Sequence, residues 1–323
     1  MQAVQSSLFQ PDRFAHANLF VADVDESVEF YRDVCGINEV FREPGVKAGF
    51  LSNGATHHDV GLMQVSDKPL IGKDGKVQNS MERGRKPGLN HIAFHVGSEQ
   101  SLVDAYRNAS EYGIRIEKAL DHGISRSLYL FDPDGNAVEF YIDIVHDWRQ
   151  FYAEHQNELI SIHWDPSSQP LAERIEPVLS MDEPVAHAPV HALEICGATL
   201  ITADLAKAVA FYTKVGGLQL LAQDDIEGVA LLALPGRDHP SLALCQTGAH
   251  ASKVGLHAVW FLARENSPVF VEPSGAATLT HKLEPGKRCS VKDPNDIHLI
   301  FYMGEQGLPT RPTRSAALSG MAD

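Results

Sequence analysis

Short runs of alternating apolar and polar residues dominate the chain and predict many short β-strands. The run at residues 14–21 is followed by apolar residues at helical spacing, with Asp23 placed to cap the helix and Gly36 placed to end it. Further strand-like runs follow at residues 39–41, 47–51 and 57–64. This order predicts a β-α-β-β-β module.

The same order returns after residues 66–87, a polar stretch with several Gly and Lys residues that predicts a long loop. The second module is predicted as a strand, a helix closed by Gly113 and three further strands, at residues 89–96, 98–112, 114–118, 127–131 and 137–142. The segment Asp132-Pro-Asp-Gly-Asn joins the last two strands, and its Pro and Gly are typical of a tight turn. These two strands are therefore predicted to form a hairpin.

The second half of the chain repeats the first. Tyr212 matches Tyr31 at the end of the first helix of each half, and residues 293–302 match residues 132–141 without a gap. We therefore predict an α+β fold of four β-α-β-β-β modules, paired into two domains with curved mixed sheets.

The same pattern predicts the domain boundaries. The first domain covers residues 1–146, with modules at 13–66 and 88–146, and the second domain covers residues 190–303. Between them, apolar residues on one face predict a helix from residue 147 to about 163, and a Pro-rich linker runs to residue 189. Residues 304–323 are rich in Ala, Ser, Pro and Gly, and we expect a flexible tail.

Composition narrows the class of protein. A chain of 323 residues has room for two domains with their own cores. The net charge of −15 argues against binding to nucleic acid or to an anionic membrane surface. No apolar run approaches the ~18 residues of a membrane span, and the first residues do not resemble a signal peptide. The four cysteines show no paired or metal-type spacing, so we expect free thiols in a cytoplasmic protein.

One residue of the hairpin stands out chemically. Glu139 lies between Val138 and Phe140 in an apolar strand. A carboxylate in such a place is costly unless it faces solvent, is paired, or binds a cation.

The four modules resemble the vicinal oxygen chelate superfamily. The string Asp121-His-Gly, then Tyr129-Leu-Phe-Asp-Pro-Asp-Gly-Asn, then Glu139 is similar to that of its type I extradiol ring-cleavage dioxygenases, the catechol 2,3-dioxygenase group. This resemblance covers roughly residues 13–303. It implies a mononuclear metal held by His16, His91 and Glu139. Two imidazoles and one carboxylate suit non-haem Fe(II), and Mn(II) shares these ligands.

The internal repeat predicts that the second domain lacks this site. Gly197 stands where the first domain has His16, and Ile300 stands where it has Glu139, so that only His257 is left of the three ligands. The well-known two-domain members of the family differ, because their C-terminal pair of modules carries the metal. We therefore predict a catalytic, metal-binding first domain and a degenerate second domain.

Three further residues match catalytic positions of the family. His58 corresponds to the acid–base histidine, and His122 to a histidine that hydrogen-bonds a substrate or intermediate oxygen, although its spacing to Tyr129 is shorter here than in some relatives. Tyr129, ten residues before Glu139, corresponds to the family's tyrosine donor. The neighbouring polar residues His57, His95 and Asp59 are given no role.

The resemblance implies ring cleavage of a catechol-type aromatic next to its two hydroxyls, with O2 and Fe(II). The expected partners are a small aromatic diol, O2 and further copies of the chain in a homo-oligomer. Two alternatives stay open: another metal-dependent enzyme on this scaffold (a glyoxalase-like isomerase, an epimerase or an antibiotic thiol transferase) and a metal-free binding protein. The ring substituents are not determined, because the pocket walls are expected to come from residues 66–87 and the helix after residue 147.

Overall fold

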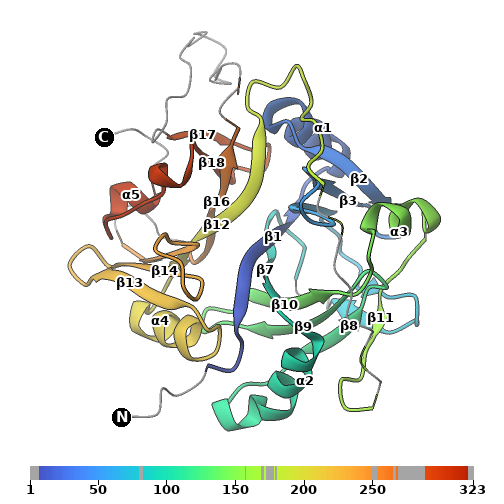
Figure 1. Cartoon of the computed structure of the whole chain (residues 1–323), viewed down its shortest axis with the longest axis horizontal. Helices are drawn as coiled ribbons and strands as arrows, with labels where there is room; N and C mark the ends of the chain where they lie inside the picture. Colours follow the sequence, from blue (N-terminus) through green and yellow to red (C-terminus); the bar gives the residue numbers. More distant parts are fainter. Residues whose placement is uncertain are drawn as a thin grey trace.

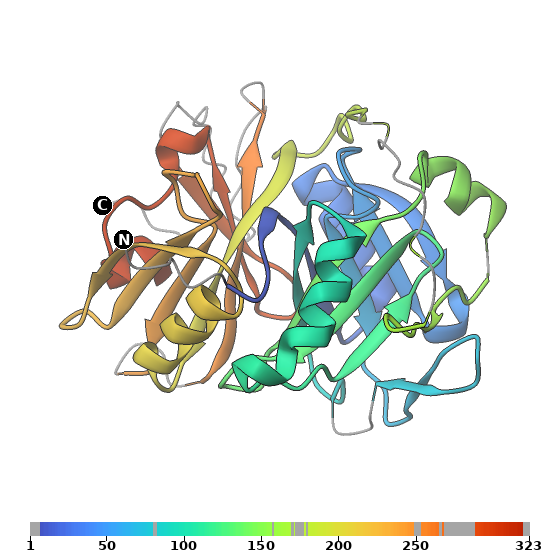
Figure 2. The same ribbon diagram turned by 60° about the horizontal axis from the view of Figure 1, so that its bottom comes forward.

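Two curled mixed β-sheets form the core of the computed structural model and lie side by side, with β1 and β12 next to each other between them (Figures 1 and 2). The first sheet has nine strands in the order β11-β8-β9-β10-β7-β1-β4-β3-β2, and the second has seven in the order β13-β14-β15-β12-β16-β18-β17. The structure describes residues 7–79, 83–156, 158–168, 171, 178, 180–248, 253–264, 267 and 288–318. Within these ranges no helix is long and apolar enough to cross a membrane.

The elements of the first half are β1 (Pro11–Val21), α1 (Val24–Cys35), β2 (Asn38–Glu43), η1 (Pro44–Val46), β3 (Ala48–Ser52), β4 (Val60–Gln64), β5 (Leu70–Ile71), β6 (Val77–Asn79), β7 (Gly88–Val96), α2 (Glu99–Asn108), η2 (Ala109–Tyr112), β8 (Lys118–Asp121), β9 (Ser125–Phe131), β10 (Ala137–Asp143), α3 (Trp148–Glu154) and β11 (Ile162–His163). Those of the second half are β12 (Ala192–Thr202), α4 (Leu205–Lys214), β13 (Gln219–Asp224), β14 (Val229–Ala233), β15 (Leu242–Gln246), β16 (Gly255–Ala263), β17 (Arg288–Lys292), β18 (His298–Tyr302), η3 (Glu305–Gly307) and α5 (Arg314–Leu318). The predicted α+β fold with a repeated β-α-β-β-β order is confirmed.

Local chemistry explains the main boundaries. The side chain of Asp23 accepts hydrogen bonds from the first backbone N–H groups of α1, and Gly36 ends the helix at a φ of 72°. Asp132 accepts hydrogen bonds from the backbone N–H groups of Asp134 and Asn136, which fixes the turn between β9 and β10. The hairpin pairs Tyr129 with Glu139.

The two sheets are joined by contacts that repeat with the sequence. The hydroxyl of Tyr31 in α1 donates to Asp293 in the turn before β18, at 3.2 Å. The matching Tyr212 in α4 donates to Asp132 in the turn before β10, at 3.0 Å. Each tyrosine of the repeat therefore holds the turn of the other half.

Three predicted elements differ from the structure. Residues 66–87 are not one continuous loop, because they contain the β5–β6 hairpin. The strand predicted at 114–118 begins at Lys118 instead. The helix predicted from residue 147 to about 163 ends at Glu154, and Ile162–His163 pairs with β8 as an edge strand. Periodicity alone did not reveal this edge, since the strand is only two residues long and depends on its partner.

The prediction of a flexible tail is wrong for residues 304–318. Ala317 in α5 is fully buried, and its carbonyl accepts a hydrogen bond from the hydroxyl of Thr199 in β12. Arg314 donates to the backbone carbonyls of Glu227 and Gln246. These contacts fix α5 against the second sheet, and residues 319–323 lie outside the described ranges.

Candidate metal centre

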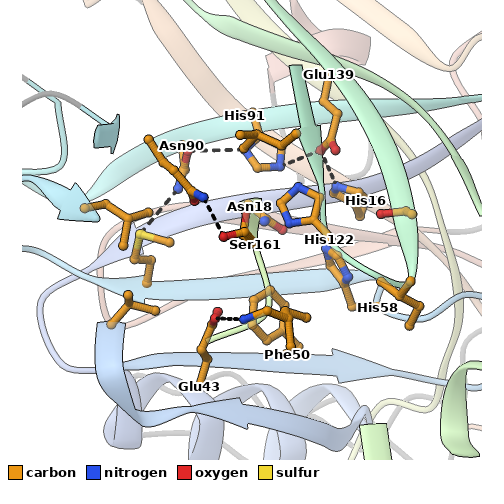
Figure 3. Close-up of a pocket in the computed structure, with 18 of the residues that line it drawn as sticks. His16, Asn18, Glu43, Phe50, His58, Asn90, His91, His122, Glu139 and Ser161 are labelled. Atoms are coloured by element: carbon orange, nitrogen blue, oxygen red, sulfur yellow. Dashed lines mark hydrogen bonds and ion pairs between the residues drawn. The ribbon is translucent and has the colours of Figure 1, made fainter. Parts of the chain in front are cut away.

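Three adjacent central strands bring the predicted metal ligands together. His16 on β1 and Glu139 on β10 are both in register with Ala93 on β7, and His91 on β7 is in register with Asn18 on β1. Side chains in register on neighbouring strands point to the same face of a sheet. The three predicted ligands therefore face one pocket inside the curl of the first sheet (Figure 3).

The ligand atoms have the spacing of a metal site. Nε2 of His16 and Nε2 of His91 each lie 2.9 Å from Oε2 of Glu139, and the three atoms fall within 4.8 Å of one another. Two ligands at right angles on a metal with bonds of about 2.1 Å are roughly 3 Å apart. All three side chains are buried, with exposed fractions of 1% for His16, 7% for His91 and 3% for Glu139. The residues present therefore fit a mononuclear metal.

Electrostatics also suit a cation at this point. Burial lowers the pKa of His16 to about 4 against the opposing effect of Glu139, so the imidazole is neutral and able to act as a ligand. Burial alone would raise the pKa of Glu139, but His91 and His16 hold it well below its ordinary value. An ionised carboxylate between two neutral imidazoles is the donor set of a divalent transition metal.

His58 lies beside the ligands without belonging to them. Its ring centroid is 4.1 Å from that of His16, and both of its buried ring nitrogens lack a hydrogen-bond partner in the part of the chain that the structure describes. Burial, with the nearby His16 and His57, lowers its pKa well below the ordinary value. His58 is thus a neutral imidazole with two free nitrogens facing the candidate metal centre.

A second trio, His16, His57 and His58, also has ligand atoms within 4.8 Å of one another. This trio contains no carboxylate to balance the charge of a divalent ion. In addition, Nδ1 of His57 is engaged by Asp143 at 2.8 Å. The trio with Glu139 is therefore the better candidate.

Tyr129 and His122 extend the site from the hairpin side. The hydroxyl of Tyr129 donates to Oε1 of Glu139 at 2.7 Å, and Nε2 of His122 lies 3.0 Å from the same hydroxyl. Because Tyr129 donates to the carboxylate, its oxygen is free to accept from His122. The structure thus brings His58, His122 and Tyr129 into one pocket with the three ligands.

The other polar residues near the site have structural partners. His57 is bonded to Asp143, and Nδ1 of His95 lies 2.7 Å from Asp12. Asp59 accepts from the backbone N–H of Asn53 and from the hydroxyl of Thr56.

The pocket also contains polar residues that the sequence did not single out, namely Asn18, Glu43, Gln78, Asn79, Asn90, Lys118, Ser125 and Ser161. Asn18 could have been found, since it lies two residues after His16 on the same face of β1. Lys118 stands 4.6 Å from the centre of the Tyr129 ring, donates to the carbonyl of Gln78, and has its pKa lowered to about 8 by burial. No local pattern marks Glu43 or Lys118.

The walls of the pocket come from the segments expected to supply them. Leu70 and Asn79 of the β5–β6 region, Tyr152 of α3, and Leu159 and Ile160 before β11 all line the pocket. The free space inside is about 100 Å³. Apolar walls around a few convergent polar groups are typical of a small-molecule site.

The second sheet has filled the equivalent space. Gly197 on β12 pairs with Trp260 on β16, just as His16 on β1 pairs with Ala93 on β7. A Cβ atom added to Gly197 would lie only 2.7 Å from the Trp260 ring. Trp260 is fully buried and donates to the hydroxyl of Thr199. In the second sheet, a tryptophan thus occupies the space that corresponds to the candidate metal centre of the first.

The prediction that His257 remains at a ligand position is wrong. In the first sheet His91 pairs with Asn18, and in the second sheet Ala258 pairs with Thr199, the counterpart of Asn18. Ala258 is therefore the counterpart of His91. His257 instead occupies a β-bulge, and its Nε2 bonds to the carbonyl of Leu318. All three ligand positions are therefore replaced in the second sheet.

Comparisons with known proteins agree with this picture. Biphenyl-2,3-diol 1,2-dioxygenase 3 from Rhodococcus globerulus is 32% identical over 131 residues, which are 41% of this chain and 63% of that protein. Catechol-2,3-dioxygenase from Bacillus subtilis (strain 168) is 24% identical over 218 residues, which are 67% of this chain and 68% of the relative. The matched part of the chain thus spans less than two thirds of the Rhodococcus protein.

Two solved structures resemble nearly the whole chain. The 2,3-dioxygenase LapB from Pseudomonas sp. KL28 superposes with a TM-score of 0.60 at 15% identity, covering 93% of this chain and 94% of the other. Homoprotocatechuate 2,3-dioxygenase from Brevibacterium fuscum, in complex with 3,4-dihydroxyphenylacetate, gives 0.59 at 17% identity and covers 97% and 87%. Residues 13–140 match the family model described as Glyoxalase/Bleomycin resistance protein/Dioxygenase superfamily, and they contain all six predicted site residues. Residues 13–140 are thus similar to that superfamily, and the chain as a whole shares the two-sheet fold of these two solved dioxygenase structures.

Proposed function

We propose that this protein is an extradiol dioxygenase that cleaves the ring of a catechol-type aromatic next to its two hydroxyls with O2. The observation that carries the proposal is the position of His58. A neutral histidine with two free ring nitrogens stands beside a His-His-Glu metal site, in a pocket that also holds Tyr129 and His122. The names of the relatives from Rhodococcus globerulus and Bacillus subtilis support the same class of substrate.

His16, His91 and Glu139 would hold the metal, which we propose to be Fe(II). When bound, the metal supplies Lewis acidity toward the hydroxyls of the diol and the redox chemistry with O2. Mn(II) accepts the same ligands and is the alternative ion. Before a substrate binds, Tyr129 keeps Glu139 in place through its 2.7 Å hydrogen bond.

His58 would act as the acid–base catalyst. The ring nitrogen that carries no proton can accept one from a substrate hydroxyl, because neither Nδ1 nor Nε2 has a partner among the described residues. The proton then stays on a ring that can return it to an oxygen of the substrate after ring cleavage. The burial that lowers the pKa of His58 favours this return.

His122 and Tyr129 would hydrogen-bond the oxygens on which charge develops, after giving up the hydrogen bonds that they make with each other and with Glu139. The hydroxyl of Tyr129 and the ring of His122 both line the pocket, and they contact each other at 3.0 Å. Hydrogen-bond donors at these two places stabilise charge that develops on a substrate oxygen. The function of a glyoxalase-like enzyme or of a metal-free binding protein would not explain why His58, His122 and Tyr129 lie together around a candidate metal site.

The test is metal loading followed by oxygen consumption. The protein would be prepared without oxygen, loaded separately with Fe(II), Mn(II) and Zn(II), and mixed with catechol, 3-methylcatechol and 2,3-dihydroxybiphenyl. We expect stoichiometric O2 uptake and the visible absorbance of a ring-opened product with Fe(II) or Mn(II). Glu139→Gln is the control for the site. Stoichiometric metal without O2 uptake on any diol would overturn the proposal, and isomerase activity on a hemithioacetal would favour a glyoxalase-like enzyme.

A further inference from the structure

A buried carboxylate stands across the pocket from the metal ligands. Glu43, the last residue of β2, lines the pocket on the side opposite His91 and Glu139 (Figure 3). Its exposed fraction is 7%. No part of the proposed mechanism uses this residue.

Because the first sheet curls, one of the two carboxylate oxygens of Glu43 has a hydrogen-bond partner near the opposite edge of the sheet. Strand β2 is one edge of the nine-stranded sheet and β11 is the other. Oε1 of Glu43 accepts a hydrogen bond of 3.2 Å from the backbone N–H of Ile160, two residues before β11. This bond joins the two edges, and within the described ranges the second carboxylate oxygen has no hydrogen-bond partner.

The surroundings of Glu43 do not supply a counter-charge. Among the described residues, the N–H of Ile160 is its one hydrogen-bond partner, and no lysine, arginine or histidine lies within ion-pair distance. Phe41, Phe50, Tyr152 and Ile160 line the same end of the pocket. Burial raises the pKa of Glu43 to about 7, against the effect of the Ile160 N–H. A carboxylate in such surroundings is costly unless something pairs with it.

We propose that Glu43 determines substrate specificity by pairing with a hydrogen-bond donor, an amine or a hydroxyl, on the ring substituent of the diol. This inference rests on the proposed function and deepens it. A protonated amine gains a charge-assisted hydrogen bond with the free oxygen, whereas a carboxylate substituent meets a like charge in an apolar wall. The pocket therefore selects amine- or hydroxyl-bearing catechols and rejects carboxylate-bearing ones.

The test uses four catechols that share a two-carbon side chain at ring position 4 and differ only at its end. They are 4-propylcatechol, 4-(2-hydroxyethyl)catechol, dopamine and 3-(3,4-dihydroxyphenyl)propanoate. Both kcat/KM and the anaerobic dissociation constant would be measured at pH 8 with the metal-loaded protein. Anaerobic binding needs no turnover.

The variant is Glu43→Gln, because its side-chain carbonyl still accepts from Ile160 and keeps the two edges joined. We expect the preference for dopamine over 4-propylcatechol to fall roughly 10- to 100-fold. The discrimination against the propanoate should weaken in the same variant. Glu39→Gln is the matched control, since Glu39 lies on the same strand but does not line the pocket, and it should change neither ratio.

The outcomes separate this inference from the proposed function. If the parent cleaves catechols but Glu43→Gln changes all four substrates equally, Glu43 only joins the edges of the sheet and the inference fails. If no catechol is cleaved, the proposed activity fails, and the anaerobic constants still decide the role of Glu43. If Glu43→Gln loses the preference for dopamine over 4-propylcatechol in those constants, the inference about Glu43 is supported. If the ratio of the two constants is unchanged in the variant, the inference is overturned.

Discussion

Replacing Glu139 with Gln should remove the metal-dependent stability of the protein while keeping its shape. Gln is isosteric with Glu and can still accept the hydrogen bond from Tyr129. It lacks the one negative charge of the ligand set, which lies 2.9 Å from both imidazoles. The variant therefore tests the metal centre with little change in packing.

The expected magnitude follows from binding linkage. A metal that binds only the folded protein, present at 100 times its dissociation constant, adds about 2.7 kcal/mol to the free energy of unfolding. For a domain of this size, that corresponds to a rise in Tm of roughly 5–10 °C. Without the carboxylate, we expect the variant to gain less than about 2 °C at the same metal concentration.

The assay is thermal unfolding under anaerobic conditions with and without added Fe(II) or Mn(II), together with metal content after desalting. The parent should show the rise in Tm and about one metal per chain, and the variant should show neither. If Glu139→Gln retained stoichiometric metal and the full rise in Tm, the ligand assignment would be wrong.

Three further predictions test the remaining assignments. His257→Ala should keep the metal content and the turnover of the parent, because His257 hydrogen-bonds to the carbonyl of Leu318 in α5 and lies away from the first sheet's ligands. A metal loss equal to that of His91→Ala would contradict this. His58→Gln should keep the metal but lose roughly 10²–10⁴ in the rate of ring cleavage, and full turnover would exclude the acid–base role. Glu43→Gln should raise the free energy of unfolding at pH 8 by up to about 3 kcal/mol, because burial raises the carboxyl pKa from its ordinary 4.5 to about 7. The carboxyl group of Glu43 is protonated more readily in the folded state, so ionised Glu43 lowers the free energy of unfolding fully above pH 7 and not at all below pH 4.5. Urea titrations of parent and variant at pH 8 and pH 4.5 test this, and the same difference in stability at both pH values would contradict it.

The sequence by itself determined most of the candidate metal centre, because strand alternation is a local property. His16 and Glu139 lie in strands whose neighbours are apolar, and the turn at Asp132 fixes the hairpin that places Tyr129 opposite Glu139. The repeat also located Tyr31 and Tyr212 correctly. Only the structure showed that each of these tyrosines bonds to the other half of the chain.

Register was decided by tertiary structure. When the first strands of the second and fourth modules are matched by sequence, His91 and His257 fall one residue apart. The sequence therefore predicts His257 as the counterpart of His91 and as a remaining ligand. A bulge beside Thr199 assigns the ligand position to Ala258 instead. A shift of one residue in a strand changes the face on which a side chain lies, and local sequence does not fix that shift.

Glu43 shows the same limit over a longer distance. It meets Ile160, 117 residues away, only because the nine-stranded sheet curls until its two edges approach each other. Glu43 ends a strand that also contains Asn38, Glu39 and Arg42, so it looks in the sequence like an ordinary surface residue. Its burial depends on closure of the sheet, which is the sum of the twists of all nine strands and cannot be read from any one of them.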